Sequence, residues 1–397
     1  MERFSAKLNS IGRAVEPSKT LAVTALAARL KSEGRDVISL TAGEPDFRTP
    51  EPVAEAGIAA IRGGATRYTA AAGEPALRAK IAAFYSERWG LPLAADNVCV
   101  SSGAKPLLYY LLCILLEPGD EVLYPVPFWV SYEAMVRMKG GVPVAVATDY
   151  ARGHKLDAAG LRAAITPRSK VLLLNNPTNP TGAVYSADEL RALAAVAREQ
   201  DLIIIADEIY EDLVYGGRKH QSFYDLEAWL PERTVVVSGF SKSYAMTGWR
   251  LGYAIGEPGL ITALASYQSQ ALSSPSQISQ RAALVALGEG RASVGPMRDA
   301  FAKRLTYCVG RMRGLGLPYV EPEGAFYLFF DTTPVCKQRG WADGAEFCTH
   351  LLDAEGVALV PGDAFGMPAW ARLSFAASDA ELSGAFDRLE RFIGQGA

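Results

Sequence analysis

Histidine and cysteine are scarce in this chain of 397 residues, which contains three histidines and five cysteines. The histidines, at positions 154, 220 and 350, are isolated from one another, and no two cysteines form a Cys-x-x-Cys pair. Metal sites and histidine-based triads need such residues in groups, so we expect no metal centre and no triad chemistry. The odd, scattered cysteines also give no sign of a disulfide framework.

Long apolar runs and an excess of one charge are absent as well. The longest uncharged apolar run, Leu107–Leu116, is ten residues, too short to span a bilayer. The N-terminal residues Met1–Lys7 lack the apolar core of a signal peptide. The formal net charge is −3 with both signs interspersed, so there is no basic stripe for nucleic acid. We therefore expect a cytoplasmic protein that binds neither membrane nor nucleic acid.

Apolar residues, by contrast, make up 49% of the chain, enough for a large buried core. Between residues 97 and 256, short strand-like runs alternate with helical patterns such as the one from Ser186 to Gln200. The strand-like runs are Val98–Ser101, Glu121–Tyr124, Pro143–Ala147, Val171–Leu174, Leu202–Ala206, Val235–Ser238 and Gly252–Ile255. This alternation predicts an α/β domain with a mostly parallel, seven-stranded sheet sandwiched by helices.

The pattern changes near residue 281. Long helical stretches, 280–287 and 294–315, precede short strands near 326–330 and 371–375 and a closing helix. We expect a large domain at 48–280 and a smaller C-terminal α+β domain at 281–397. The N-terminal segment 1–47 is predicted to pack with the small domain, leaving a cleft between the two domains.

Lys242 is the most informative residue of the chain. It follows a strand-like run, Thr234–Ser238, and Arg250 lies eight residues further on. A partly desolvated lysine can form an imine with an aldehyde, and an arginine binds phosphate oxygens with its planar fork. Together the two residues suggest a phosphate-bearing aldehyde held covalently, a description that pyridoxal 5'-phosphate fits. The alternative for Lys242 is a solvated surface lysine.

Three further polar residues follow predicted strands. Asp207 and Tyr210 come directly after Leu202–Ala206, and ligands of parallel sheets bind beyond the carboxyl ends of strands. Asp207 is predicted to keep a pyridine nitrogen protonated, and Tyr210 to donate to the phenolate oxygen of the ring. Asn179, in the proline-rich turn after Val171–Leu174, is a second donor to that oxygen, with a cis peptide predicted at Pro180. The alternatives are a helix-capping aspartate and an ordinary turn.

Two more turns complete the predicted cofactor site. Ser102, Gly103, Ala104 and Lys105 join a strand to a helix, where free N–H groups can bind a phosphate. Trp129, after the next strand, is placed to lie flat on an aromatic ring, although packing in the core would also explain it. Alone, each of these signals is weak.

Arg372 is a charge inside an apolar strand, Trp370–Phe375, of the predicted small domain. A buried arginine needs an anionic partner. This partner is either a substrate α-carboxylate, held by two parallel hydrogen bonds, or a carboxylate of the protein in a structural ion pair.

Nearly from end to end, the chain resembles the class I/II aminotransferases, which are fold-type I pyridoxal-phosphate enzymes. It is most similar to the bacterial branch of aspartate and prephenate aminotransferases. The motifs that carry the resemblance are Pro17–Thr20, Thr41–Phe47, Tyr68–Thr69, Asn179–Gly182, Asp207–Tyr210, Ser241–Lys242, Met246–Arg250, Gly324–Tyr327, Pro361–Gly362 and Arg372–Phe375. In this order they are highly specific for fold and cofactor.

The resemblance assigns each candidate a role at the cofactor. It makes Lys242 the Schiff-base lysine, next to Ser241, and Asp207 the partner of the pyridine nitrogen. Tyr210 and Asn179 are then the donors to the ring oxygen. Trp129 is the stacking aromatic, and Arg250 is the phosphate arginine.

It also assigns contacts to the substrate and to a second subunit. Arg372 matches the clamp for the α-carboxylate, Gly43 a backbone contact to substrate, and Lys105 a lysine that helps to bind a distal carboxylate. Tyr68 matches a tyrosine that reaches the phosphate in the neighbouring subunit, which implies a homodimer with shared active sites.

The sequence departs from the family pattern near the distal pocket. Pro106 stands where relatives usually have glutamine, and Glu16 where prephenate-using relatives commonly have lysine. A carboxylate at 16 would oppose a second substrate carboxylate. Tyr109 and Tyr110 add bulk near the same turn.

The leading hypothesis is therefore a transaminase that moves an amino group between an L-amino acid, aspartate-like or glutamate-like, and a 2-oxo acid by a ping-pong mechanism. The departures leave open a specialised pyridoxal-phosphate enzyme that eliminates, replaces, cyclises or oxidises. A third alternative is a regulator that senses a ligand with this fold. It would need an N-terminal DNA-binding domain, for which the chain shows no basic recognition helix.

Overall fold

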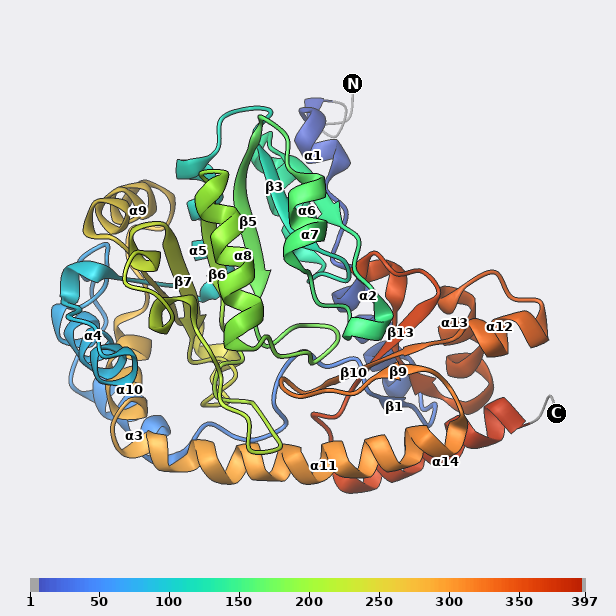
Figure 1. Cartoon of the computed structure of the whole chain (residues 1–397). Helices are drawn as coiled ribbons and strands as arrows, with labels where there is room; N and C mark the ends of the chain where they lie inside the picture. Colours follow the sequence, from blue (N-terminus) through green and yellow to red (C-terminus); the bar gives the residue numbers. More distant parts are fainter. Residues whose placement is uncertain (1–6, 395–397) are drawn as a thin grey trace.

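A seven-stranded sheet forms the centre of the larger part of the molecule in the computed structural model, which describes residues 7–394 (Figure 1). Its strand order is β2-β8-β7-β6-β5-β3-β4, and β8 alone runs antiparallel to its neighbours. The strands are β2 (Val98–Ser101), β3 (Glu121–Pro125), β4 (Val142–Val146), β5 (Ser169–Asn175), β6 (Ile203–Asp207), β7 (Thr234–Gly239) and β8 (Gly252–Ile255). The mostly parallel sheet predicted from the alternating pattern is confirmed.

Both faces of this sheet are buried under helices, which explains why its strands are apolar at consecutive positions. Leu172 and Leu174 of β5 pack in one cluster, while Val171 and Leu173 pack in another on the opposite face. One face carries α5 (Ala104–Leu115), α6 (Ser131–Lys139) and α9 (Pro258–Ala271). The other carries α4 (Pro75–Trp89), α7 (Ala158–Ala164) and α8 (Ala187–Glu199), with α10 (Gln277–Ala286) and α3 (Glu51–Arg62) packed beyond α4.

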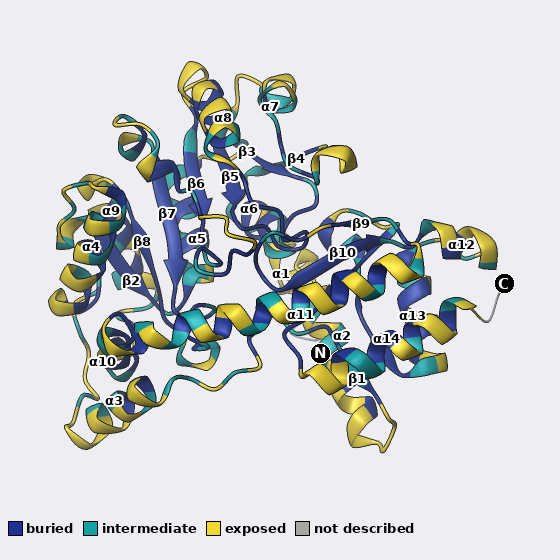
Figure 2. Ribbon diagram, turned by 60° about the horizontal axis from the view of Figure 1, so that its bottom comes forward, coloured by how far each residue is buried: buried dark blue, intermediate teal, exposed yellow. Residues whose placement is uncertain are grey.

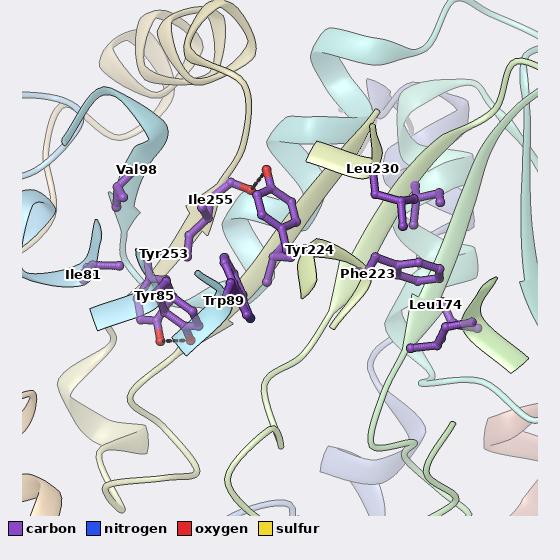
Figure 3. Packing of buried hydrophobic residues seen from close by; sticks show 14 of the residues in the cluster. Ile81, Tyr85, Trp89, Val98, Leu174, Phe223, Tyr224, Leu230, Tyr253 and Ile255 are labelled. Carbon is purple, nitrogen blue, oxygen red and sulfur yellow. Dashed lines mark hydrogen bonds between the residues drawn. The ribbon is translucent and has the colours of Figure 1, made fainter. Parts of the chain in front are cut away.

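Aromatic residues fill the space between α4 and the sheet (Figure 3). Tyr85 and Tyr253 are both buried, and their hydroxyl groups are 2.8 Å apart. Trp89 packs against the rings of Tyr85 and Tyr224, and the hydroxyl group of Tyr224 donates to the carbonyl of Ile255 at 3.3 Å. Buried tyrosines need such partners, because an unpaired hydroxyl in the core costs about 1–3 kcal/mol.

The second part of the molecule contains a four-stranded antiparallel sheet of order β12-β13-β10-β9. These strands are β9 (Tyr319–Val320), β10 (Tyr327–Asp331), β12 (Val360–Pro361) and β13 (Trp370–Ser374). The helices of this part are α12 (Thr333–Arg339), α13 (Gly344–Glu355) and α14 (Asp379–Gly394). The long helix α11 (Val294–Leu315) lies along the lower edge of Figure 1 and reaches from α10 to α14.

The N-terminal elements contact this second part. After the short helix α1 (Ser10–Ala14), helix α2 (Lys19–Ser32) contacts β12 and β11 (Val357–Ala358). Strand β1 (Ile38–Ser39) pairs in parallel with β11. Figure 2 shows most strands in the buried colour, although the edge strand β4 is largely of intermediate burial, whereas most helices are exposed along one side.

The division into segments 1–47, 48–280 and 281–397 stays a prediction. The proposed boundary at 280 falls inside α10, whose residues pack on α3 and α4. Within residues 7–394, no helix is both long and apolar enough to cross a membrane.

Candidate active site

A cavity of about 410 Å³ opens beside the carboxyl ends of β5, β6 and β7. Parallel strands end at the same edge of a sheet, which brings residues far apart in sequence to one place. Eleven residues singled out from the sequence line this cavity: Gly43, Ala104, Lys105, Trp129, Asn179, Asp207, Tyr210, Ser241, Lys242, Arg250 and Arg372.

Lys242 lies in the turn after β7 and points its amino group into the cavity. Its Nζ donates a short hydrogen bond to the carbonyl oxygen of Gly43. Burial lowers the pKa of Lys242 to about 8, and the positive charges of Arg250 and Arg372 act in the same direction. The carboxylates of Glu44 and Asp207 oppose this shift. A substantial fraction of Lys242 is therefore unprotonated near neutral pH, as a nucleophilic amine must be.

Asp207 ends β6 and is buried, with only 4% of its surface exposed. Tyr132 donates to its Oδ2 at 2.7 Å. Burial raises the pKa of Asp207 to about 6, although the hydrogen bond from Tyr132 opposes the rise. The chain after Asp207 forms turns, with no α-helix there for the carboxylate to cap. The cost of burying this carboxylate is better explained by a cationic partner in the cavity.

Asn179 and Tyr210 lie beside Asp207 because the ends of β5 and β6 are joined by side-chain hydrogen bonds. Asn175 donates from Nδ2 to the carbonyl of Asp207 at 2.9 Å and accepts the backbone N–H of Asn179 at 2.7 Å. The Asn179–Pro180 peptide is cis, as predicted. Tyr210 and Tyr327 place their hydroxyl groups 2.8 Å apart.

Arg372 is a buried cation without a counter-charge. It is 2% exposed, and its guanidinium donates to Oδ1 of Asn179 at 3.0 Å and to the carbonyl of Thr41 at 2.9 Å. The guanidinium lies 4.3 Å from the centre of the Tyr327 ring, and its Nε has no hydrogen-bond partner. No carboxylate in residues 7–394 forms an ion pair with Arg372, and burial lowers its pKa. A structural ion pair thus does not explain this arginine, whereas an anionic ligand would.

The start of α5 and Arg250 converge at the other end of the cavity. Gly103 is the N-cap residue of α5, and no side chain caps the first N–H groups of that helix. A methyl group added at Gly103 would lie 2.8 Å from Nη2 of Arg250, and one added at Gly252 would lie 2.5 Å from the backbone nitrogen of Ala104. Uncapped N–H groups next to a guanidinium form a favourable site for a phosphate.

Lys105 and Trp129 form one wall of the cavity. The Nζ of Lys105 lies 4.7 Å from the centre of the Trp129 ring, and burial, helped by the charge of Arg250, lowers the pKa of Lys105. Ser102 and Gly103 stand just outside the lining, and Tyr68 lies apart from it with 88% of its surface exposed.

The residues that depart from the family pattern line a neighbouring cavity of about 970 Å³. Glu16, Pro106, Tyr109 and Tyr110 all contribute to its wall, and Lys105 lines both cavities. None of the four lines the active-site cavity itself, and Lys105 is the residue through which the two cavities meet.

Four contributors to the site were missed as functional residues: Tyr132, Tyr327, Glu44 and Thr247. Tyr327, Glu44 and Thr247 belong to motifs that carry the family resemblance, and Tyr132 lies three residues after Trp129. No spacing rule, however, shows which hydroxyl group meets Asp207 or Tyr210. Only the packing of α6 and β10 against the strand ends makes those contacts.

The arrangement combines an accessible amine, a buried carboxylate, an anion site at a helix start and an unpaired arginine. The family model for "Aminotransferase class I and II" matches residues 35–389. The chain belongs to this family, and its fold is that of the fold-type I pyridoxal-phosphate transferases. It is a transaminase that uses pyridoxal 5'-phosphate.

Individual relatives cover almost the whole chain. An aspartate aminotransferase of Geobacillus stearothermophilus is 43% identical over 95% of this chain and 96% of its own length. An aspartate/prephenate aminotransferase of Thermus thermophilus is also 43% identical, over 96% of this chain and 98% of its own. The solved structure of aspartate aminotransferase from Thermus thermophilus with maleate superposes with a TM-score of 0.92 at 42% identity, covering 97% of this chain and 99% of that one.

Proposed function

We propose that this transaminase takes the amino group of a dicarboxylic L-amino acid, aspartate or glutamate, and transfers it to a 2-oxo acid by a ping-pong mechanism. The observation that carries an α-amino acid as substrate is the buried guanidinium of Arg372, which has no ion-pair partner among the described residues, in the same cavity as the amine of Lys242. Lys105 in the same lining supports a second carboxylate on that substrate. The names of the relatives support aspartate as donor.

The cofactor fits the residues that surround the cavity. Lys242 would bind its aldehyde carbon, Asp207 would face its ring nitrogen, and the start of α5 with Arg250 would hold its phosphate. Tyr210, Asn179 and Trp129 are its remaining predicted contacts. When bound, pyridoxal phosphate supplies an electron sink for the electron pair left behind when the substrate loses its α-proton.

The chain itself positions the substrate and moves the proton. Arg372 binds the α-carboxylate, and Asn179, whose Oδ1 accepts a hydrogen bond from Arg372, holds the guanidinium in place for it. Lys242, with a pKa near 8, takes the proton from the α-carbon and returns it as general acid. Lys105 is proposed to bind the distal carboxylate.

We also propose that two copies of the chain form a homodimer with shared sites. Tyr68, the residue predicted to act in the neighbouring subunit, is almost fully exposed and lies outside the cavity of its own chain. A tyrosine in that position is available to a second copy.

The experiment that tests the reaction mixes the enzyme with aspartate alone. A ping-pong transaminase should release one equivalent of 2-oxo acid per active site, then stop, and resume only when a second 2-oxo acid is added. Continuous release of ammonia without a second 2-oxo acid would instead indicate one of the specialised reactions, and the ping-pong proposal for aspartate would then be wrong.

A further inference from the structure

We propose that Arg304 and Asp46 form a clasp that positions the Gly43 carbonyl against Lys242, which makes Arg304 a positioning residue for the reaction. The inference rests on the proposed role of Lys242. It concerns the segment Thr41–Phe47, here named the strap, which lies between β1 and α3.

The strap contacts three groups of the site in succession. Thr41 accepts a hydrogen bond from Arg372 at 2.9 Å, and the carbonyl of Gly43 accepts one from Lys242. Glu44 accepts one from the hydroxyl group of Thr247 at 2.6 Å. The position of the strap therefore determines the surroundings of both the amine and the carboxylate clamp.

The start of the strap is held by backbone hydrogen bonds. The N–H of Leu40 donates to Ala358 at 3.0 Å, and the carbonyl of Leu40 accepts from Ser374 at 2.8 Å. These bonds join the strap to β11 and β13.

The far end of the strap is held by a side chain of α11. Arg304 donates from its two terminal nitrogens to the two carboxylate oxygens of Asp46, at 2.7 and 2.8 Å. The same guanidinium lies over the rings of Phe47 and Phe301, 5.2 and 5.6 Å from their centres. The side chain of Arg304 is 12% exposed and that of Asp46 is 29% exposed, so the two-point contact is partly buried. Arg304 also lies 3.4 Å from the exposed carboxylate of Asp379.

Loss of the clasp would release the strap at one end, three residues from the carbonyl that Lys242 uses. A carbonyl acceptor favours the charged form of an amine over the neutral form. A less well placed Gly43 carbonyl should therefore lower the pKa of Lys242 further. The charged groups that act on Lys242, namely Glu44, Asp207, Arg250 and Arg372, stay unchanged in the test below.

The test is the double variant Asp46→Asn/Arg304→Met, which removes one charge of each sign. Its matched control is Asp387→Asn/Arg311→Met. Arg311 lies seven residues further along α11, donates to Asp387 at 2.8 Å and lies over the ring of Phe386, but it has no contact with the strap.

The first measurement is the pKa of Lys242 in the full-length protein freed of cofactor, from the pH dependence of its acetylation by acetic anhydride. We expect the pKa of Lys242 to fall by about half to one unit in the clasp variant, because that is the shift that weakening one hydrogen bond produces. In the control variant we expect no shift. In the holoenzyme, kcat should fall about threefold to tenfold in the clasp variant and stay near wild type in the control. A loss of thermal stability should be similar in both.

An unchanged pKa in the clasp variant, with stability lost as in the control, would show that the pair only stabilises the fold. If the double variant does not fold, Arg304→Lys replaces it in the test. This variant keeps the positive charge but cannot make the two parallel hydrogen bonds to Asp46. It should shift the pKa in the same direction by less, and no shift would overturn the proposal. Failure of the proposed function would look different, because the wild-type enzyme would then fail the test with aspartate alone, whatever the pKa of Lys242 in the clasp variant.

Discussion

Lys242 owes its chemistry to its surroundings. Burial lowers the pKa of its amine to about 8, and the positive charges of Arg250 and Arg372 act in the same direction, so the amine is near half protonation at pH 8. An exposed lysine with a pKa near 10.5 would be almost fully protonated at the same pH.

Replacing Lys242 with alanine should abolish turnover and remove the covalent link to the cofactor. In residues 7–394, Lys105 is the other lysine that lines the cavity, and it lies on the wall formed with Trp129. The measurement is borohydride reduction followed by mass spectrometry of the chain. A Lys242→Ala protein that still carried a reducible cofactor would contradict the assignment.

Asp207 should make the stability of the cofactor-free protein depend on pH. Its pKa is raised to about 6, so the folded state binds this proton more tightly than the unfolded state does. Stability should therefore fall as pH rises from about 4 to 6 and then level off. Asp207→Asn, which keeps an acceptor for Tyr132, should be more stable than wild type at pH 7.5 but not at pH 4.5.

Thermal unfolding of both cofactor-free proteins at the two pH values measures this effect. An identical difference between variant and wild type at pH 4.5 and 7.5 would mean that the carboxyl has its ordinary pKa.

Lys105 and Glu16 should act on substrate choice in opposite directions. If Lys105 binds a distal carboxylate, Lys105→Ala should weaken kcat/KM for aspartate and glutamate at least about 30-fold more than for alanine, because cutting one partner of such a pair costs about 2–5 kcal/mol. Glu16→Lys should improve substrates with a second carboxylate. Equal losses for all amino acids in Lys105→Ala would assign Lys105 to the phosphate or to the fold.

At the scale of elements, the start of α5 leaves little room for added atoms. Gly103 has φ of 104°, and a methyl group there would crowd Arg250. Gly103→Ala should weaken cofactor binding by about tenfold or more, since it both strains the turn and displaces the guanidinium.

Gly119→Ala is the matched control for this prediction. Gly119 has φ of 91°, but nothing lies within 4 Å of the added methyl group. Both variants should lose similar stability, while titration of the cofactor-free proteins with pyridoxal phosphate should show the lower affinity only for Gly103→Ala. Equal affinities would mean that Gly103 serves only the turn.

The sequence predicted the elements better than the contacts between them. The bounds of β2, β8 and α11 were predicted to the residue, because apolar runs bounded by turn residues mark a buried strand and a long amphipathic pattern marks a helix. The strand predicted at Leu202–Ala206 is β6, which begins and ends one residue later, at Ile203 and Asp207. Such an end is decided by hydrogen bonds to β5 and β7, which no local pattern contains.

The candidate site was predicted as a set of residues but not as a geometry. The strand-end rule brought Asp207, Asn179 and Lys242 to one edge of the sheet. It could not show that Arg372 lacks a carboxylate partner or that Tyr132 donates to Asp207, since both facts depend on the packing of separate units. The roles of these residues at the cofactor stay predictions.

At the scale of the whole molecule, the shared-site proposal can be tested by mixing two inactive forms. If Tyr68 acts in the neighbouring site, a hybrid of one Lys242→Ala chain and one Tyr68→Ala chain contains one site with both native residues. Activity after subunit exchange should therefore exceed the sum of the two separate proteins. No gain, with exchange confirmed by mass spectrometry, would place Tyr68 outside the site.

The antiparallel strand β8 has a consequence for how the enzyme could be cut or rearranged. The loop from β7 to β8 leaves and re-enters the sheet at the same end of these two antiparallel strands. Lys242 and Arg250 both lie in this one loop. The proposed covalent anchor, Lys242, and the proposed phosphate anchor, Arg250, are thus tethered to each other by the seven residues between them. New chain termini at a distant surface turn would leave this tether intact. Cleavage of a single peptide bond between Lys242 and Arg250 would leave every helix and strand intact. It would nevertheless break the backbone connection between the two residues proposed to hold the cofactor.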